Sequence, residues 1–241
     1  DPVWNVASGA VVSFVARTVA VQAGPDGGQS TVETSAMTPK SYAVLARKLL
    51  QFVGELVGDS PGAPPAIAVH VPLSFNGLAH SGSRMSVLSD LKKLAMTGWK
   101  PRLFLELVDV PAALPQVRLT ELVAQLRPFV RGVLVRVPPE TRDLKRWDRC
   151  GAMGMIATLD PTKTEREQIA QIQKFAADTA SLGVVASLYG VRSRSLTLAA
   201  WAAGVHLLSG DYVAQKYGDV VSAQRFLAED LYRGEIAPAA S

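Results

Sequence analysis

The sequence lacks several features that would place it in a class at once. It has one cysteine, Cys150, so no disulfide can form within the chain and a disulfide scaffold is excluded. No apolar run reaches the roughly 18 residues of a membrane helix; the longest candidate, 196–208, is short and contains His206. No cationic start precedes an apolar signal stretch, and no Walker motif or Gly-rich phosphate loop follows any predicted strand. We therefore expect a cytoplasmic chain with no membrane segment.

Charge is also sparse, at 19% of the residues with a net charge of +4. The basic clusters lie at 92–93 and 142–149, and acidic and apolar residues interrupt the second, so they indicate solvated helix faces and not a nucleic-acid patch. The hydrophobic content of 48% excludes disorder. The length suits one large domain, and we expect a single barrel domain over 1–241. Because the chain begins Asp1-Pro2 rather than Met, we expect it to be a piece of a longer protein.

What the sequence does contain is a regular alternation of strand and helix patterns. The first two strands flank a turn at 7–9 and form a predicted hairpin. Thr38-Pro39 opens a helix, and Thr164 with Glu167 forms a capping box for the clearest helical pattern, which Gly183 ends. Further helices are predicted around 87–95, 119–126, 141–150, 193–203 and 223–232, and a loop over 23–35. The eight predicted strands are 3–6, 11–21, 67–71, 103–108, 133–137, 153–159, 184–188 and 205–208.

Eight strands with alternating helices predict an α/β fold, a closed (β/α)8-type barrel. A doubly wound open sheet is the alternative, which the missing phosphate loop makes less favourable. Catalytic groups of a barrel sit at the carboxyl ends of its strands. Those ends supply few candidates here: Glu106 and Asp109 from one strand and His70 from another. The three could form a transition-metal site, whereas a lone histidine on an apolar strand is more often a hydrogen-bonded structural residue.

Several segments resemble EAL domains, the cyclic di-GMP phosphodiesterases, in the same order along the chain. The opening 2–17 resembles Gln-Pro-Ile, a turn and Glu-Ala-Leu-Leu-Arg, and 68–73 resembles the strand that carries Asn-x-Ser. Residues 103–109, Leu-Phe-Leu-Glu-Leu-Val-Asp, resemble Glu-Leu-Thr-Glu, while 182–187 and 203–212 resemble the late Ala-Glu-Gly-Val-Glu and Gly-x-Asp-x-x-Gln-Gly strands. The resemblance implies a barrel whose first strand is antiparallel to the rest, which agrees with the N-terminal hairpin.

The resemblance also implies a chemistry that this chain has largely lost. EAL catalysis uses divalent metals, and hard cations such as Mg²⁺ need oxygen ligands. Only Glu106 remains as a ligand position, and Asp109 keeps the charge of the second acid in its motif. The other positions align as follows: the first glutamate with Val15, the asparagine with His70, the aspartate pair with Pro138-Pro139, the lysine within 155–157, the late glutamate near Ser187, and the glutamine with Ser209. A register shift could bring Glu140 or Asp143 toward the missing aspartates, but it could not restore Val15.

These departures predict no catalytic residues, no bound metal and a vestigial site made of Glu106, Asp109, His70, Val15, Pro138 and Ser209. Mg²⁺ or Mn²⁺ is expected only if the site works after all. We expect cyclic di-GMP to bind weakly or not at all. Arg17, two residues before the position of the phosphate-binding arginine, and Glu106 are the ligand-binding candidates.

Three functions therefore stay open. The first is a catalytically inactive regulatory or protein-interaction module, a homodimer or a partner-binding protein, in bacterial cyclic di-GMP-type signalling. The second is a receptor that binds cyclic di-GMP without hydrolysing it, and the third is a weakly active metal-dependent phosphodiesterase. For the first, Trp201 and the terminal segment with Phe226 and Tyr232 are candidate contact surfaces, although both could simply cover the barrel.

Overall fold

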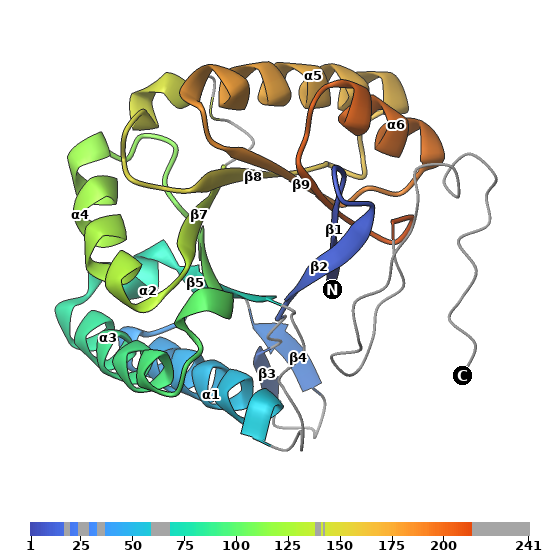
Figure 1. Ribbon diagram of the computed structural model, residues 1–241. Helices are drawn as coiled ribbons and strands as arrows, with labels where there is room; N and C mark the ends of the chain where they lie inside the picture. Colours follow the sequence, from blue (N-terminus) through green and yellow to red (C-terminus); the bar gives the residue numbers. More distant parts are fainter. Residues whose placement is uncertain are drawn as a thin grey trace, which may run out of the picture.

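The computed structural model shows a closed barrel of eight strands surrounded by helices, which confirms the predicted fold class (Figure 1). The structure describes residues 1–16, 20–23, 29–32, 37–58, 68–137, 141 and 143–213. The barrel strands are β1 (Pro2–Asn5), β2 (Ala10–Val15), β5 (Ala68–Ser74), β6 (Leu103–Val108), β7 (Gly132–Arg136), β8 (Gly154–Thr158), β9 (Val185–Tyr189) and β10 (Leu207–Ser209).

The order of strands around the barrel is β1-β10-β9-β8-β7-β6-β5-β2. The first strand is antiparallel to both of its neighbours, with Trp4 opposite Leu208 on β10 and Val11 on β2. Every other neighbouring pair is parallel. This confirms the antiparallel first strand, which enters the barrel through the predicted hairpin with β2.

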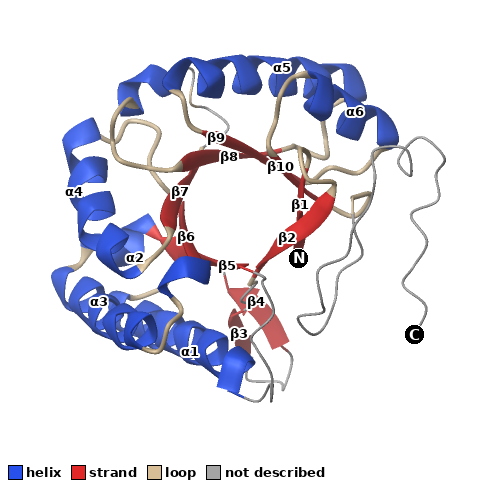
Figure 2. Cartoon of the chain, viewed as in Figure 1, coloured by secondary structure: helices blue, strands red, loops and turns tan. Residues whose placement is uncertain are grey.

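Helices cover the outside of the barrel (Figure 2). Their caps follow the sequence signals: Thr164 and Glu167 form the capping box of α5, and Gly183 ends that helix in the left-handed conformation with φ 65°. No described helix is both long and apolar enough to span a membrane. The helices are α1 (Pro39–Gly58), α2 (Phe75–Ala79), α3 (Ser81–Met96), α4 (Gln116–Leu126), α5 (Glu165–Leu182) and α6 (Arg194–Ala202), with 3-10 turns η2 (Lys100–Arg102), η3 (Arg127–Phe129) and η4 (Leu144–Trp147).

The long predicted strand 11–21 is wrong, because two separate strands occupy it. β2 ends at Val15, and the backbone of Ala16 makes a last hydrogen bond to His70 of β5. The chain then forms β3 (Ala20–Ala23), which pairs with β4 (Gln29–Val32) in a two-stranded sheet separate from the barrel. The loop expected over 23–35 therefore contains a strand. Composition alone did not show it, because a strand needs a partner to hydrogen-bond.

The helix predicted over 141–150 is also wrong, since only the short turn η4 forms there. The Asp143 carboxylate accepts a hydrogen bond from the Lys145 backbone and starts the turn, and Arg149 at φ 54° cannot continue a right-handed helix. Leu144 and Trp147 are buried three residues apart, a spacing that one turn satisfies. The predicted helix 223–232 lies outside the described residues.

The barrel interior is separated from the larger core between strands and helices. On β6, Leu105 and Leu107 face the outer core, whereas Glu106 between them points inward, as strand alternation requires. A small apolar cluster fills the barrel: Val3, Val15, Leu134, Ile156 and Tyr189, with Phe104 and Leu207 against it. Buried polar side chains lie on the same strands, among them Ser13, His70, Glu106, Ser187 and Ser209.

Candidate functional site at the barrel mouth

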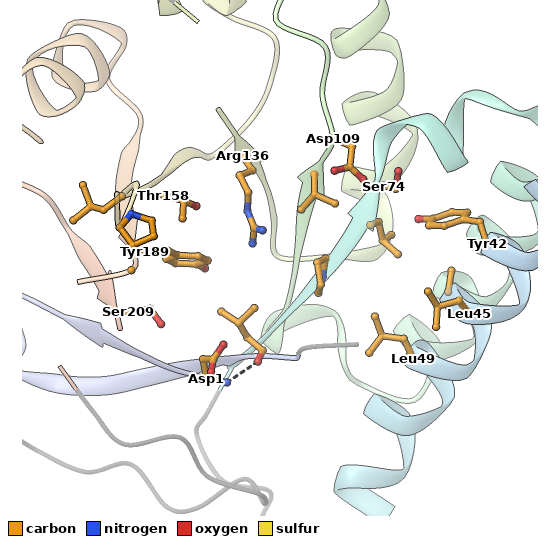
Figure 3. Close-up of a pocket in the computed structure, with 18 of the residues that line it drawn as sticks. Asp1, Tyr42, Leu45, Leu49, Ser74, Asp109, Arg136, Thr158, Tyr189 and Ser209 are labelled. Atoms are coloured by element: carbon orange, nitrogen blue, oxygen red, sulfur yellow. Dashed lines mark hydrogen bonds between the residues drawn. The ribbon is translucent and has the colours of Figure 1, made fainter. Parts of the chain in front are cut away.

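A cavity of about 580 Å³ opens at the carboxyl ends of the parallel strands. Figure 3 shows the side chains of Arg136 and Tyr189 directed into it, with Thr158 beside them and Ser209 near the first strands. Three predicted positions, Val15, Asp109 and Ser209, line this cavity. Its other polar lining residues are Asp1, Tyr42, Ser74 and Arg192.

Glu106 lies fully buried beneath the mouth, with both carboxylate oxygens already occupied. Arg136 Nη2 donates to Oε2 at 2.8 Å, and His70 Nδ1 lies 3.0 Å from Oε1. The Tyr189 hydroxyl donates a short hydrogen bond to the same Oε1. The guanidinium, the imidazole and the phenol thus occupy three of the about four lone-pair sites of this carboxylate, and Glu106 is not among the residues that line the cavity.

The electrostatics keep this carboxylate ionised. Burial by itself would raise the pKa of Glu106, but hydrogen bonding and charge interaction with His70, the positive charge of Arg136 and the Tyr189 hydrogen bond outweigh burial and hold the pKa below its ordinary value. Arg136 also lies over the Tyr189 ring, 5.5 Å from its centre. Glu106, Arg136 and Tyr189 therefore form one structural network.

His70 belongs to that network and not to the mouth. In the β5–β6 register Pro72 stands opposite Glu106, while His70 stands opposite Phe104, two residues deeper in the barrel. Its Nε2 lies 3.1 Å from Ser13 Oγ, so both ring nitrogens have hydrogen-bond partners. The serine of the Asn-x-Ser motif also matches Ser74, the N-cap of α2, which favours Pro72 for the asparagine position. Proline offers no ligand atom there.

Tyr189 is the site residue that sequence alignment missed. It directly precedes Gly190-Val191, so Leu188–Arg192 match the late Ala-Glu-Gly-Val-Glu motif without inserted residues, and Tyr189 replaces its first glutamate. Anchoring the alignment on that Gly-Val pair would have found it. Tyr189 also pairs in register with Ser209 on β10 and Thr158 on β8, which places all three at one level of the mouth.

Arg136 is a second residue of the mouth that is absent from the sequence-based candidates. It lies at the end of β7, two residues after the inward-facing Leu134 and thus on the same strand face. The alternation along the strand predicts that Arg136 points inward. It does not predict that Arg136 pairs with Glu106 on β6. The predicted positions Arg17 and Pro138, and Glu140 with them, lie outside the described residues.

These residues do not fit a divalent metal. A hard cation takes several oxygen ligands, mostly carboxylates. Within the described part of the chain no group of three or more His, Cys, Asp or Glu side chains is arranged to hold an ion. Glu106 is already engaged, and Val15, Pro72 and Tyr189 stand where the EAL motifs have an acid or an asparagine. The trio of His70, Glu106 and Asp109 is therefore not assembled as a metal site.

Comparisons with known proteins identify the fold. No known family model matches the sequence, and no curated protein does. The solved structure of the Bacillus subtilis YkuI protein, which has an EAL domain and was solved with substrate c-di-GMP and calcium, shares 13% identity at a TM-score of 0.73. It matches 96% of this chain, whereas this chain spans 58% of YkuI.

Two further solved structures agree. The PaMucR phosphodiesterase in complex with c-di-GMP shares 16% identity over 95% of this chain and 96% of that chain, at a TM-score of 0.65. The Xanthomonas citri FimX EAL domain in complex with c-diGMP shares 12% identity at a TM-score of 0.61. The match covers 90% of this chain and 88% of that chain. At these identities the likeness establishes the fold: the chain has the EAL-type barrel, as its motifs predicted.

Proposed function

We propose that this chain is a catalytically inactive EAL-like module that acts through protein contact in cyclic di-GMP-type signalling in the bacterial cytoplasm. The observation that carries the proposal is the state of Glu106. Its two oxygens are bonded to Arg136, His70 and Tyr189, and Glu106 is not among the residues that line the mouth cavity. To bind a metal, Glu106 would have to leave a buried ion pair, which costs several kcal/mol by general estimates.

Hydrolysis of a phosphodiester in this fold would need a water activated by metal ions. With Val15, Pro72 and Tyr189 around the mouth, the barrel supplies too few oxygen ligands to hold them. We expect no metal-dependent conversion of cyclic di-GMP to the linear dinucleotide. The test is incubation with Mg²⁺ or Mn²⁺ followed by chromatography, with an active EAL phosphodiesterase as the positive control. Formation of linear product that chelation abolishes would contradict the proposal and support the weakly active enzyme.

The alternative is a receptor that binds cyclic di-GMP without cutting it. The mouth cavity of about 580 Å³ favours it, because Arg136 and Arg192 line this cavity and could face phosphate oxygens. Against it, Arg136 is already paired with Glu106. We expect weak or absent binding by calorimetry. Micromolar affinity that falls in Arg192→Met or Arg17→Ala, but not in Arg166→Met on the outer face of α5, would establish the receptor instead.

The protein-contact part of the proposal concerns the outer surface. Trp201 on α6 is 37% exposed, and aromatic side chains such as tryptophan are enriched at protein interfaces. Stable interfaces bury roughly 800 Å² on each partner. We expect light scattering over a concentration series to show a dimer, or pull-down from the native cell to retain a specific partner. Substitutions at Phe226 or Tyr232 should abolish that association. Folded Glu106→Ala and His70→Ala variants should associate as the parent does. The reverse pattern would show that the association depends on the barrel mouth and not on the outer surface.

A further inference from the structure

A second cavity, of about 380 Å³, lies at the opposite end of the barrel from the mouth. Its lining residues come from the starts of the parallel strands, such as Ala68 of β5 and Val185 of β9, and from the β1 end at Asn5. We call it the lower cavity. Its volume falls within the roughly 300–1,000 Å³ of small-ligand pockets. The full lining is Asn5, Val12, Ser13, Ala68, His70, Phe104, Arg131, Leu134, Met153, Val185, His206 and Leu207.

The walls of the lower cavity are mostly apolar. Two inward positions at its level are glycines, and neighbouring side chains occupy their space: a Cβ on Gly132 would lie 2.5 Å from Met153 Sδ, and one on Gly154 would lie 2.6 Å from a Leu134 methyl. The side chains of Met153 and Leu134 therefore pack against the glycine backbone and form the wall, together with Phe104. At the inner end lie Ser13 and His70, bonded to each other and, through His70, to Glu106.

The rim of the lower cavity is positively charged. The Arg131 guanidinium lies over the Phe104 ring at 5.7 Å, and within the described structure it makes one hydrogen bond, to the Pro101 carbonyl at 3.3 Å. It has no carboxylate partner among the described residues. His206 Nδ1 accepts a hydrogen bond from the Ala186 backbone, so the neutral ring carries its proton on Nε2 and can donate it. The residues that line the lower cavity all lie in the described part of the chain, and none of them is an aspartate or a glutamate.

We propose that the lower cavity binds a small monoanion with an apolar body, an aromatic or short-chain carboxylate. The guanidinium of Arg131 matches a carboxylate with two parallel hydrogen bonds, and His206 Nε2 supplies a further donor. The apolar body enters between Phe104, Leu134 and Met153, where it loses water-exposed surface. The site is separated from the mouth by the Ser13–His70–Glu106 chain, so this inference does not rest on the proposed function.

The test compares charged and neutral ligands of one shape. Calorimetry and ligand-observed NMR with benzoate and hexanoate should show binding with a Kd of about 1 mM or tighter. Benzyl alcohol and hexanol should bind at least about tenfold more weakly, since they lack the charge that pairs with Arg131. Equal affinity for acids and alcohols, or no binding of either acid at about 10 mM, would overturn the proposal.

Variants locate the site. Arg131→Met should lower benzoate affinity at least about tenfold, and Ala68→Phe, which fills the cavity, should abolish it. Arg166→Met on α5 and Arg192→Met at the mouth are the matched controls and should leave the affinity unchanged. Arg131 is exposed, so its variant should fold as the parent does, which circular dichroism checks. Benzoate binding that persists in Arg131→Met but disappears in Arg192→Met would assign the anion to the mouth and refute the lower site.

Discussion

Glu106 and Arg136 meet inside the barrel mouth, with 2.8 Å between Oε2 and Nη2, although thirty residues separate them in the chain. The glutamate is fully buried, while the arginine side chain keeps 34% of its surface exposed. This asymmetry means that the carboxylate depends on the pair more than the guanidinium does, because part of the Arg136 side chain is open to solvent.

Glu106→Gln should lower the free energy of unfolding by about 2–3 kcal/mol. Removing one partner of a buried ion pair costs about 3–5 kcal/mol, and the exposure of Arg136 reduces that cost because water can solvate the remaining charge. Urea unfolding monitored by circular dichroism measures the change. Glu121→Gln on α4 is the matched control: its pair with Arg118 spans 3.8 Å at the surface, and we expect a change within about 0.5 kcal/mol. Equal effects of the two substitutions would contradict the network.

The same pair predicts how stability depends on pH. The folded state holds the pKa of Glu106 below its ordinary value of 4.5, so the unfolded chain takes up this proton at a higher pH than the folded one. The contribution is therefore complete above 4.5 and is lost as the pH falls below that value through the folded pKa. Urea unfolding from about pH 7 to about pH 3 should show the stability difference between the parent and Glu106→Gln shrinking in acid. A difference that stays constant over that range would argue against an ionised, network-bound Glu106.

Gly210→Ala should destabilise the end of the barrel by about 1–3 kcal/mol or more. A Cβ at this glycine would lie 2.2 Å from the Val191 carbonyl oxygen and 2.4 Å from the Val191 nitrogen, and backbone atoms cannot move aside as side chains do. Gly82→Ala is the control, and we expect it to raise stability where Gly210→Ala lowers it. Gly82 lies within α3, and a methyl group added there would meet no atom within 4 Å, so alanine should stabilise the helix by roughly 0.5–1 kcal/mol. Thermal unfolding of the two variants should shift in opposite directions.

Cys150 should resist alkylation in the folded protein. It is 2% exposed, and burial raises the pKa of its thiol, so the reactive thiolate is scarce. Iodoacetamide labelling followed by mass spectrometry should be slow in buffer and fast in urea. Rapid labelling under native conditions would show that the chain around Cys150, whose backbone donates a hydrogen bond to the Trp147 carbonyl at the end of η4, opens readily.

The sequence alone carried much of the fold. Apolar strands that alternate with capped helices predict a barrel, and the turn between the first two strands predicts a hairpin. The resemblance to EAL domains adds that the first strand runs against the others. The capping box of Thr164 and Glu167 is a local device that needs no tertiary information, and the structure reproduces it. The loss of a ligand atom at Val15 is equally local, since valine can coordinate nothing in any surroundings.

The contents of the mouth were decided by tertiary structure. Alternation along a strand tells which side chains share a face, but a register between two strands is set only when they pair, and a slip of one residue reverses every side chain. Register is what places the backbone of Pro72 opposite Glu106 and that of His70 two residues deeper, from where its ring reaches the Glu106 carboxylate. Tyr189 reaches His70 across 119 residues of sequence only because the barrel closes. The sequence thus determined that Val15 carries no ligand atom, while closure of the barrel decided that Glu106 is held by an arginine, a histidine and a tyrosine.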